Sequence, residues 1–212
     1  MKKIIYTLSI VLGLTLSANA QIESLAGPRL GVVYMSASPA STFLNGDLSL
    51  SGDFPIQDEY DDIAKGAFTT LYGWQWESRF ADGSDVTGIV EWIVLVGGME
   101  RGKFLPSVSS MVGARTYSGL EFAVGPNLSM GGVAMVFGIG YNFRSGDLNM
   151  PVNIAFVPGR AGNRDGHTDG HEVDPDGTPN SGDDYWQDGY KYDVDYHTGN
   201  RFSITVGFNL GR

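Results

Sequence analysis

The chain has 212 residues, with 14 basic and 24 acidic residues and no cysteine. This acidic balance argues against a nucleic-acid partner, because phosphate binding needs a basic surface. Disulfide bonds are excluded, and 30 glycines together with 12% aromatic residues favour β-structure with tight turns over a helical bundle.

Residues 1–20 have the pattern of a secretory signal peptide. Two lysines precede an apolar run over 4–16, and the small-residue pattern Ala18-x-Ala20 predicts a signal peptidase site. We therefore expect export, cleavage after Ala20 and one mature domain over 21–212. Without the two leader lysines, 12 basic residues face 24 acidic ones, so the mature chain has a net charge near −12.

Eight later segments alternate apolar and polar residues, as strands with two different faces do. Most are close to the roughly 9–11 residues of a tilted membrane strand. In chain order they cover residues 29–38, 67–80, 86–96, 104–116, 120–129, 133–144, 148–157 and 201–210. The last is the clearest. One of its faces carries Phe202, Ile204, Val206, Phe208 and Leu210, and the other carries Ser203, Thr205, Gly207 and Asn209.

The connections between these segments differ greatly in length. Residues 81–85, 117–119 and 145–147 are short and rich in the Gly, Asp and Ser of hairpin turns. The connections 39–66 and 159–200 are long, and they hold 16 of the 24 acidic residues. In an up-and-down barrel the three turns share one rim and both long connections share the other, which is the asymmetry of outer-membrane barrels.

The first long connection contains the only segment that we expect to be helical. Pro55 suits a first helical turn, Asp53 could cap it, and Gly66 suits its end. We therefore predict a helix over 55–66 with an acidic outer face.

The alternating strands do not by themselves say which face lies inside. One face carries large aromatic and aliphatic residues, and the other carries Gly, Ala, Asn, Ser and a few charges. An eight-stranded barrel has room inside only for side chains or one small ligand, so we place the bulky face outside, against lipid. The predicted fold is all-β: an eight-stranded antiparallel up-and-down transmembrane β-barrel with two long extracellular loops on one rim. The alternative is a soluble lipocalin-like barrel that binds a small apolar ligand inside.

This pattern resembles the small eight-stranded outer-membrane barrels of the OmpA/OmpX type. The closing segment 202–208 looks like the assembly signal of such barrels, although the chain continues to Arg212 instead of ending on an aromatic residue. Segments 73–79 and 125–129 also resemble uncharacterised barrel proteins of the Bacteroidetes type. The resemblance implies a bacterial outer-membrane location, and it implies no activity.

Several charged residues fall on the polar, inward parity of the strands. Because buried charge is costly unless it is paired, we predict a salt-bridge network that closes the lumen; the alternative is a gate or an ion path. The predicted members are Arg29, Glu77, Arg79, Glu91, Arg115, Glu121 and Arg144.

The second long connection contains a candidate calcium site. Glu172, Asp174 and Asp176 alternate before a glycine, and Asp183 stands where a closing ligand would. This spacing resembles an EF-hand loop, but it lacks flanking helices and has Glu first and Asp last. A partial second copy begins at Asp165. The alternative interpretation is a solvated acidic loop without a cofactor.

All three histidines, His167, His171 and His197, lie in the same connection and none lies in the eight predicted strands. They leave a transition-metal site and a lipid-modifying hydrolase at the rim as alternatives. We expect no enzyme. The aromatic residues between 185 and 196 suit contact with an extracellular protein or glycan, or a small core within the loop. We therefore predict a structural or adhesive role, with membrane lipid as a partner and the oligomeric state open.

Overall fold

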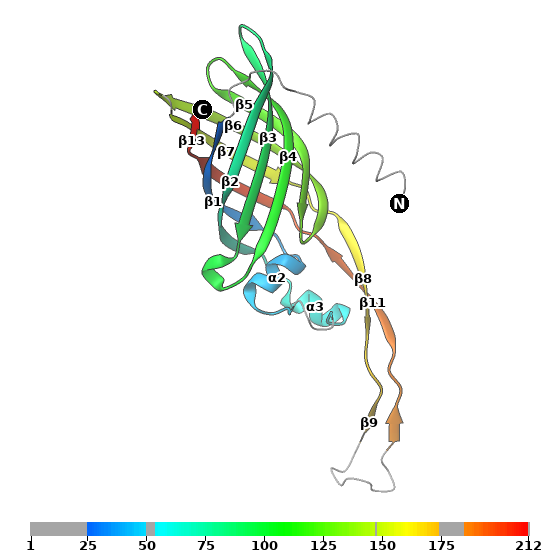
Figure 1. Ribbon diagram of the computed structural model, residues 1–212. Helices are drawn as coiled ribbons and strands as arrows, with labels where there is room; N and C mark the ends of the chain where they lie inside the picture. Colours follow the sequence, from blue (N-terminus) through cyan, green and yellow to red (C-terminus); the bar gives the residue numbers. More distant parts are fainter. Residues whose placement is uncertain (1–24, 50–53, 147, 174–184, 212) are drawn as a thin grey trace.

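The chain forms a closed barrel of eight antiparallel staves (Figure 1). The computed structural model describes residues 25–49, 54–146, 148–173 and 185–211. The staves are β1 (Leu25–Met35), β2 (Ala67–Asp82), β3 (Val86–Gly97), β4 (Leu105–Thr116), β5 (Leu120–Ser129), β6 (Gly132–Ser145), β7 (Leu148–Val157), and an eighth made of β12 (Arg201–Gly207) and β13 (Asn209–Gly211). Each stave pairs with the next, and β1 closes the barrel by pairing with β2 on one side and β12 and β13 on the other. The predicted eight-stranded up-and-down topology is confirmed.

The closing stave is interrupted at Phe208, which the sequence did not indicate. The Phe208 N–H donates to the Pro28 carbonyl at 3.0 Å, and Gly27 packs so tightly there that a Cβ would collide with the Phe208 carbonyl oxygen. Strand β1 also begins at Leu25, four residues before its predicted start, although it contains Gly27 and Pro28. Gly-Pro is a turn signal in isolation, but here pairing with β2 from Leu25 onward overrides it.

The two rims of the barrel are built differently (Figure 1). The short turns β2–β3, β4–β5 and β6–β7 lie at one end, which we call the turn rim. The two long connections lie at the opposite end, the loop rim, together with the short 3₁₀ turn η1 (Met99–Arg101). In the part of the chain that the structure describes, no helix is long and apolar enough to cross a lipid bilayer.

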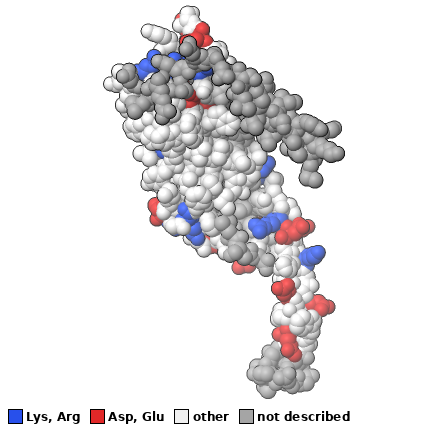
Figure 2. Space-filling view, viewed as in Figure 1, with Lys and Arg blue, Asp and Glu red and all other residues white. Residues whose placement is uncertain are grey.

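The large apolar side chains of the staves point outward, so the predicted assignment of faces agrees with the structure. We call the exposed set the belt, and in Figure 2 the middle of the visible face is largely free of charge. The belt comprises Leu30, Val32, Tyr34, Phe68, Tyr72, Trp74, Trp76, Phe80, Trp92, Val108, Val112, Phe122, Val124, Leu128, Val133, Met135, Phe137, Ile139, Tyr141, Phe143, Ile154, Phe202 and Ile204.

The described residues of the first long connection form two short helices. Helix α3 (Gln57–Ile63) lies within the predicted range 55–66, but its N-cap is Ile56, which makes no side-chain cap bond, and it ends before Gly66. The proposed cap Asp53 lies outside the described residues. Helix α2 (Pro39–Asn45) was not predicted, although Ser38 and Ser41 form a reciprocal capping box in which Ser41 takes the place of the usual Glu or Gln.

The second long connection lies at the loop rim, as predicted, and its described residues add strands that were not predicted. Strand β8 (Ala161–His167) pairs with β11 (Lys191–His197), and β9 (His171–Val173) pairs with β10 (Tyr185–Gln187). Together they form a long two-stranded hairpin that extends away from the loop rim (Figure 1). We call its described residues, 161–173 and 185–197, the hairpin.

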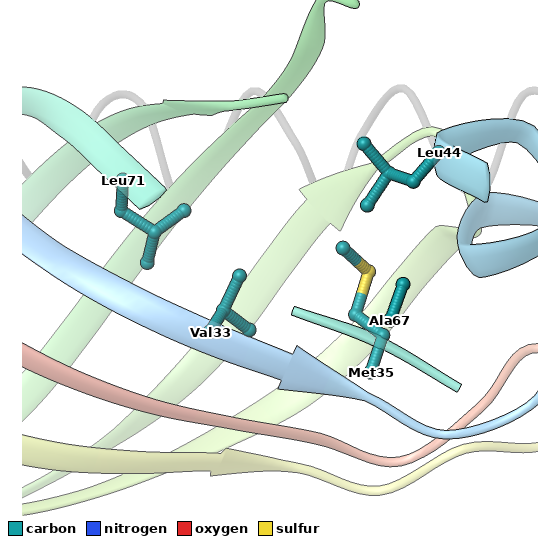
Figure 3. Close-up of a cluster of buried hydrophobic side chains, with 5 residues drawn as sticks. All are labelled: Val33, Met35, Leu44, Ala67 and Leu71. Atoms are coloured by element: carbon teal, nitrogen blue, oxygen red, sulfur yellow. The ribbon is translucent and has the colours of Figure 1, made fainter. Parts of the chain in front are cut away.

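Three apolar clusters hold the loop-rim half together. In the first, Leu44 of α2 packs onto lumen-facing side chains of β1 and β2, on one side of the mouth of the barrel (Figure 3). The second lies inside the lumen and contains Ile93, Met111, Val136 and Val157. The third joins the base of the hairpin to α3 through Phe54, Tyr60 and Val194, with Tyr192 and Tyr196 packed against them.

Candidate functional site

The lumen of the barrel is divided along its length. The half near the turn rim holds a set of buried polar and charged side chains, and the half near the loop rim is lined mainly by apolar ones. The expectation of a polar lumen therefore describes only one half. Some apolar residues also point into the lumen, in strand β4 and at the ends of β1 and β3. The alternation of apolar and polar residues in the other strands did not predict them.

One charged cluster is centred on Arg115. Its Nη1 and Nη2 donate to the two carboxylate oxygens of Glu77 at 2.6 and 2.5 Å, and its Nε donates to Glu121. Strands β2, β4 and β5 supply these three side chains. A guanidinium group in this geometry makes the bidentate contact that matches a carboxylate best, so the three residues tie three staves together inside the lumen.

A second cluster is centred on Arg29. Its Nη1 donates to the Gln75 side-chain oxygen at 2.5 Å and its Nε donates to the Thr205 hydroxyl at 2.9 Å. The amide nitrogen of Gln75 donates in turn to Glu91 at 2.5 Å. Asn153 accepts from Nη2 at 3.0 Å when its amide oxygen is turned toward the guanidinium. The cluster therefore joins β1, β2, β3, β7 and β12 across the lumen.

These two clusters form what we call the plug: Arg29, Gln75, Glu77, Glu91, Arg115 and Glu121. Each plug residue is at most 4% exposed, so water does not reach it freely. Isolated buried charges would be strongly unfavourable, and the bidentate and relayed hydrogen bonds offset that cost. Three carboxylates face two guanidinium groups, which makes the plug more acidic than basic.

The seven residues of the predicted network fall into two groups. Five of them (Arg29, Glu77, Glu91, Arg115 and Glu121) meet in the plug. Arg79 and Arg144 line an open vestibule at the turn rim, and Arg144 is exposed and donates to Asn149 at 3.2 Å. Sequence reasoning left out Gln75 and Thr205, which parity had placed on the inward faces but which carry no charge.

A cavity of about 110 Å³ lies on the loop-rim side of the plug, and we call it the lumen cavity. Val33, Leu71, Ile93, Met111 and Val136 are among its walls. Its polar lining includes Asn127, Ser129 and Arg201, and Arg201 donates to Ser129 at 2.9 Å and to Asn127 at 3.0 Å. Arg201 was not among the predicted lumen charges, since it stands at the edge of its predicted strand.

Glu100 holds the η1 turn to the loop rim. Its carboxylate accepts from the hydroxyls of Thr69 and Thr70, both at 2.5 Å, and from the Thr70 N–H at 3.2 Å. Partial desolvation alone would raise the pKa of Glu100, but these hydrogen bonds outweigh it and lower the pKa to about 2. The group is therefore ionised throughout the physiological range.

Among the described residues of the acidic hairpin, no metal site is assembled. Glu172 lies exposed in β9, and the other three proposed calcium ligands, Asp174, Asp176 and Asp183, lie outside the described residues. Within the described ranges, no three His, Cys, Asp or Glu side chains gather as a metal would require. The calcium site therefore stays a prediction.

The histidines lie on strands of the hairpin, in β8, β9 and β11, where a loop had been expected. The Nε2 atom of His167 lies 3.5 Å from Oδ1 of Asp169, and both side chains are exposed. The nearby aromatic residues divide in two: Tyr192 and Tyr196 pack into the cluster at the hairpin base, while Tyr185, Trp186 and Tyr190 are more than half exposed.

Comparisons with known proteins include a match to a solved structure. No family model matches the chain, and no curated protein matches it. The chain is similar to the solid-state NMR structure of the outer membrane protein AlkL in DMPC lipid bilayers, with 9% sequence identity, 92% of each chain covered and a TM-score of 0.40.

Proposed function

We propose that this protein is a bacterial outer-membrane β-barrel with a closed lumen, which anchors the hairpin in the membrane and presents it outside the cell. The observation that carries the proposal is the belt, an apolar surface that surrounds a closed barrel. The proposed role is structural or adhesive and not enzymatic.

The belt supports insertion in lipid. A barrel dissolved in water would expose this whole surface, at a cost of about 25 cal/mol for each Å² of apolar area. The soluble lipocalin-like alternative requires a polar exterior, whereas here the exterior is apolar and the turn-rim half of the interior is charged. Closure of the sheet also satisfies the strand hydrogen bonds without water, as lipid requires.

The plug supports a closed lumen. The vestibule at the turn rim ends at Arg115, and the lumen cavity on the other side is bounded by Arg29. Between them, side chains from adjacent staves and from staves two apart are joined by hydrogen bonds of 2.5 to 2.9 Å, which together involve β1, β2, β3, β4 and β12. An ion crossing the barrel would have to break several charge-assisted hydrogen bonds at once.

The hairpin supports the presenting role. Its base is fixed to α3 and the residues before it by three hydrogen bonds. The Tyr192 hydroxyl donates to the Phe54 carbonyl at 2.7 Å. The side-chain amide of Gln57 donates to the Asp195 carbonyl and accepts from the Asp195 N–H. Tyr185, Trp186 and Tyr190 remain exposed toward its far end. Exposed aromatic residues on a fixed support suit contact with a protein or glycan surface.

The location is tested by membrane fractionation of cells that express the full chain, with boiled and unboiled samples compared on a detergent gel. We expect the protein in the outer membrane, with a mobility that changes on heating. A soluble protein without such a change would contradict the proposal.

The closed lumen is tested separately with purified protein in planar bilayers. We expect no steady conductance from the unmodified chain. A reproducible open channel in the unmodified protein would show that the plug does not seal the barrel, even if the outer-membrane location is correct.

A further inference from the structure

The lumen cavity adjoins a second pocket at the loop rim. This rim pocket, about 140 Å³, lies among α2, the hairpin base and the β5–β6 turn, and its walls include Phe43 and Phe54. The two spaces share the lining residues Ala40, Leu105, Met130, Gly131 and Thr198. The two spaces are therefore neighbours that share a wall, and we call them together the joined pocket, which lies between the loop rim and the plug.

The walls of this joined pocket are mostly apolar. A cavity of about 150 Å³ lined by aliphatic and aromatic side chains stays dry and accepts a benzene-sized molecule. The lumen cavity, at about 110 Å³, has room for a small apolar group, and the rim pocket extends the space outward. Its volume thus fits a short apolar tail and excludes a large ligand.

The charged residues of the joined pocket have one sign. Arg29, Arg164 and Arg201 line it, and no Asp or Glu does so among the described residues. This is the reverse of the chain as a whole, which has 24 acidic and 14 basic residues. Arg29 is engaged in the plug and Arg164 lies over the Phe54 ring at 5.2 Å, near the mouth.

Arg201 is the cation whose charge is not compensated. Its two Nη atoms donate to the neutral Ser129 and Asn127, and no carboxylate of the described residues forms an ion pair with it. A guanidinium with only neutral acceptors beside an apolar cavity gains most from an anion, because charge-assisted hydrogen bonds are about twice as strong as neutral ones. Its planar donors match a carboxylate in particular.

We propose that the joined pocket binds a small organic carboxylate, with the carboxylate on Arg201 and a short apolar tail among the side chains of the lumen cavity. The hydrogen-bonded side chains of the plug close the lumen behind the cavity, so the pocket holds its ligand and does not conduct it. This site is independent of the role proposed for the hairpin.

The test uses the full-length protein in phosphatidylcholine nanodiscs and equilibrium dialysis with radiolabelled hexanoate, with empty nanodiscs subtracted. Hexanol serves as the neutral ligand with the same tail length. We expect saturable binding, with hexanoate bound about tenfold more tightly than hexanol. Hexanoate that does not saturate, or that binds no better than hexanol, would overturn the proposal without any variant.

Two variants assign the binding to Arg201. R201Q keeps hydrogen-bonding capacity but removes the charge, so it is expected to abolish the preference for hexanoate and to retain hexanol binding. R144Q removes an arginine at the opposite rim and is expected to bind as the unmodified protein does. The heat-dependent gel shift checks that each variant is folded. A folded R201Q protein that still prefers hexanoate would refute the assignment.

Discussion

Arg115 is the residue on which the plug depends most. It makes three hydrogen bonds to Glu77 and Glu121, and its removal leaves two buried carboxylates without their cation. Breaking a buried ion pair by removing one partner costs roughly 3–5 kcal/mol. We therefore expect R115M to lower the free energy of unfolding by about that amount, measured by urea denaturation in lipid vesicles. R144M, which loses an exposed arginine, is the control; equal losses in both variants would show that the plug does not stabilise the barrel.

Glu100 gives the loop rim a dependence on pH. Its pKa of about 2 in the folded protein lies below its ordinary value of 4.5, so its stabilising effect is complete above pH 4.5 and is lost as the pH falls through 2. We expect the protection of the Gly98 amide, which donates to Thr69, to fall over that interval when its hydrogen exchange rate is compared with the intrinsic rate at each pH. In E100Q this loss of protection should be missing; its persistence there would assign the effect to another group.

At the scale of residues, strand parity predicted which side chains face the lumen but not what they contact. Glu77 and Glu121 were correctly placed inside, yet nothing in the sequence says that both meet Arg115 while Glu91 is reached through Gln75. Those partners depend on the relative register of the staves, which no single strand encodes. Arg201 was missed for a related reason, since a residue at a strand end can lie either in the lumen or at the rim.

The hairpin has a regular internal design. Gly162 and Gly166 stand opposite Tyr196 and Tyr192, and a Cβ on either glycine would come within 2.6 and 2.5 Å of the tyrosine ring. Aromatic rings that lie over cross-strand glycines cover backbone that would otherwise be exposed and help to fix the register. This packing accounts for ordered strands in a segment whose Gly content made it read as a loop.

One pair in the hairpin opposes this stabilisation. Asp165 lies directly across from Asp193, both exposed, and like charges in opposing positions are unfavourable by about 0.2–1 kcal/mol. We expect D193N to slow hydrogen exchange at the neighbouring Val194 amide by about 1.4- to 5-fold. D188N makes the same charge change outside the paired strands and should leave that rate unaltered. Faster exchange in D193N would mean that the two carboxylates share a bound cation.

Whole elements were predictable where two-residue periodicity is undisturbed. Strands β5 and β7 match their predicted ranges, and β2, β3, β4 and β6 differ by at most two residues at either end. Alternation over ten or more residues is a strong signal. Helix α2 and the hairpin carry no such periodicity. Helix α2 begins at a capping box of two serines, and the hairpin is stabilised by glycine–aromatic pairs. Both are held by tertiary contacts, which a single sequence reveals poorly.

For the whole molecule, the orientation in the membrane can be measured by protease access. Arg164 and Lys191 lie on the hairpin, and Arg144 lies at the turn rim. On intact cells we expect trypsin to cut at the hairpin sites and to spare Arg144, with peptides identified by mass spectrometry. Permeabilised cells are the control, in which Arg144 becomes accessible. Cutting at Arg144 on intact cells, with the hairpin sites protected, would reverse the orientation.

The length of the hairpin sets how far its exposed end stands from the bilayer. Residues 161–173 cover 13 positions, and at about 3.3 Å per residue a strand of that length spans roughly 40 Å. The Debye length at physiological ionic strength is only about 8 Å. Tyr185 and Trp186 therefore operate several screening lengths away from the charge of the lipid headgroups. The electrostatic attraction or repulsion between these residues and a partner therefore depends on the charges of the hairpin itself. It does not depend on the lipid composition of the membrane.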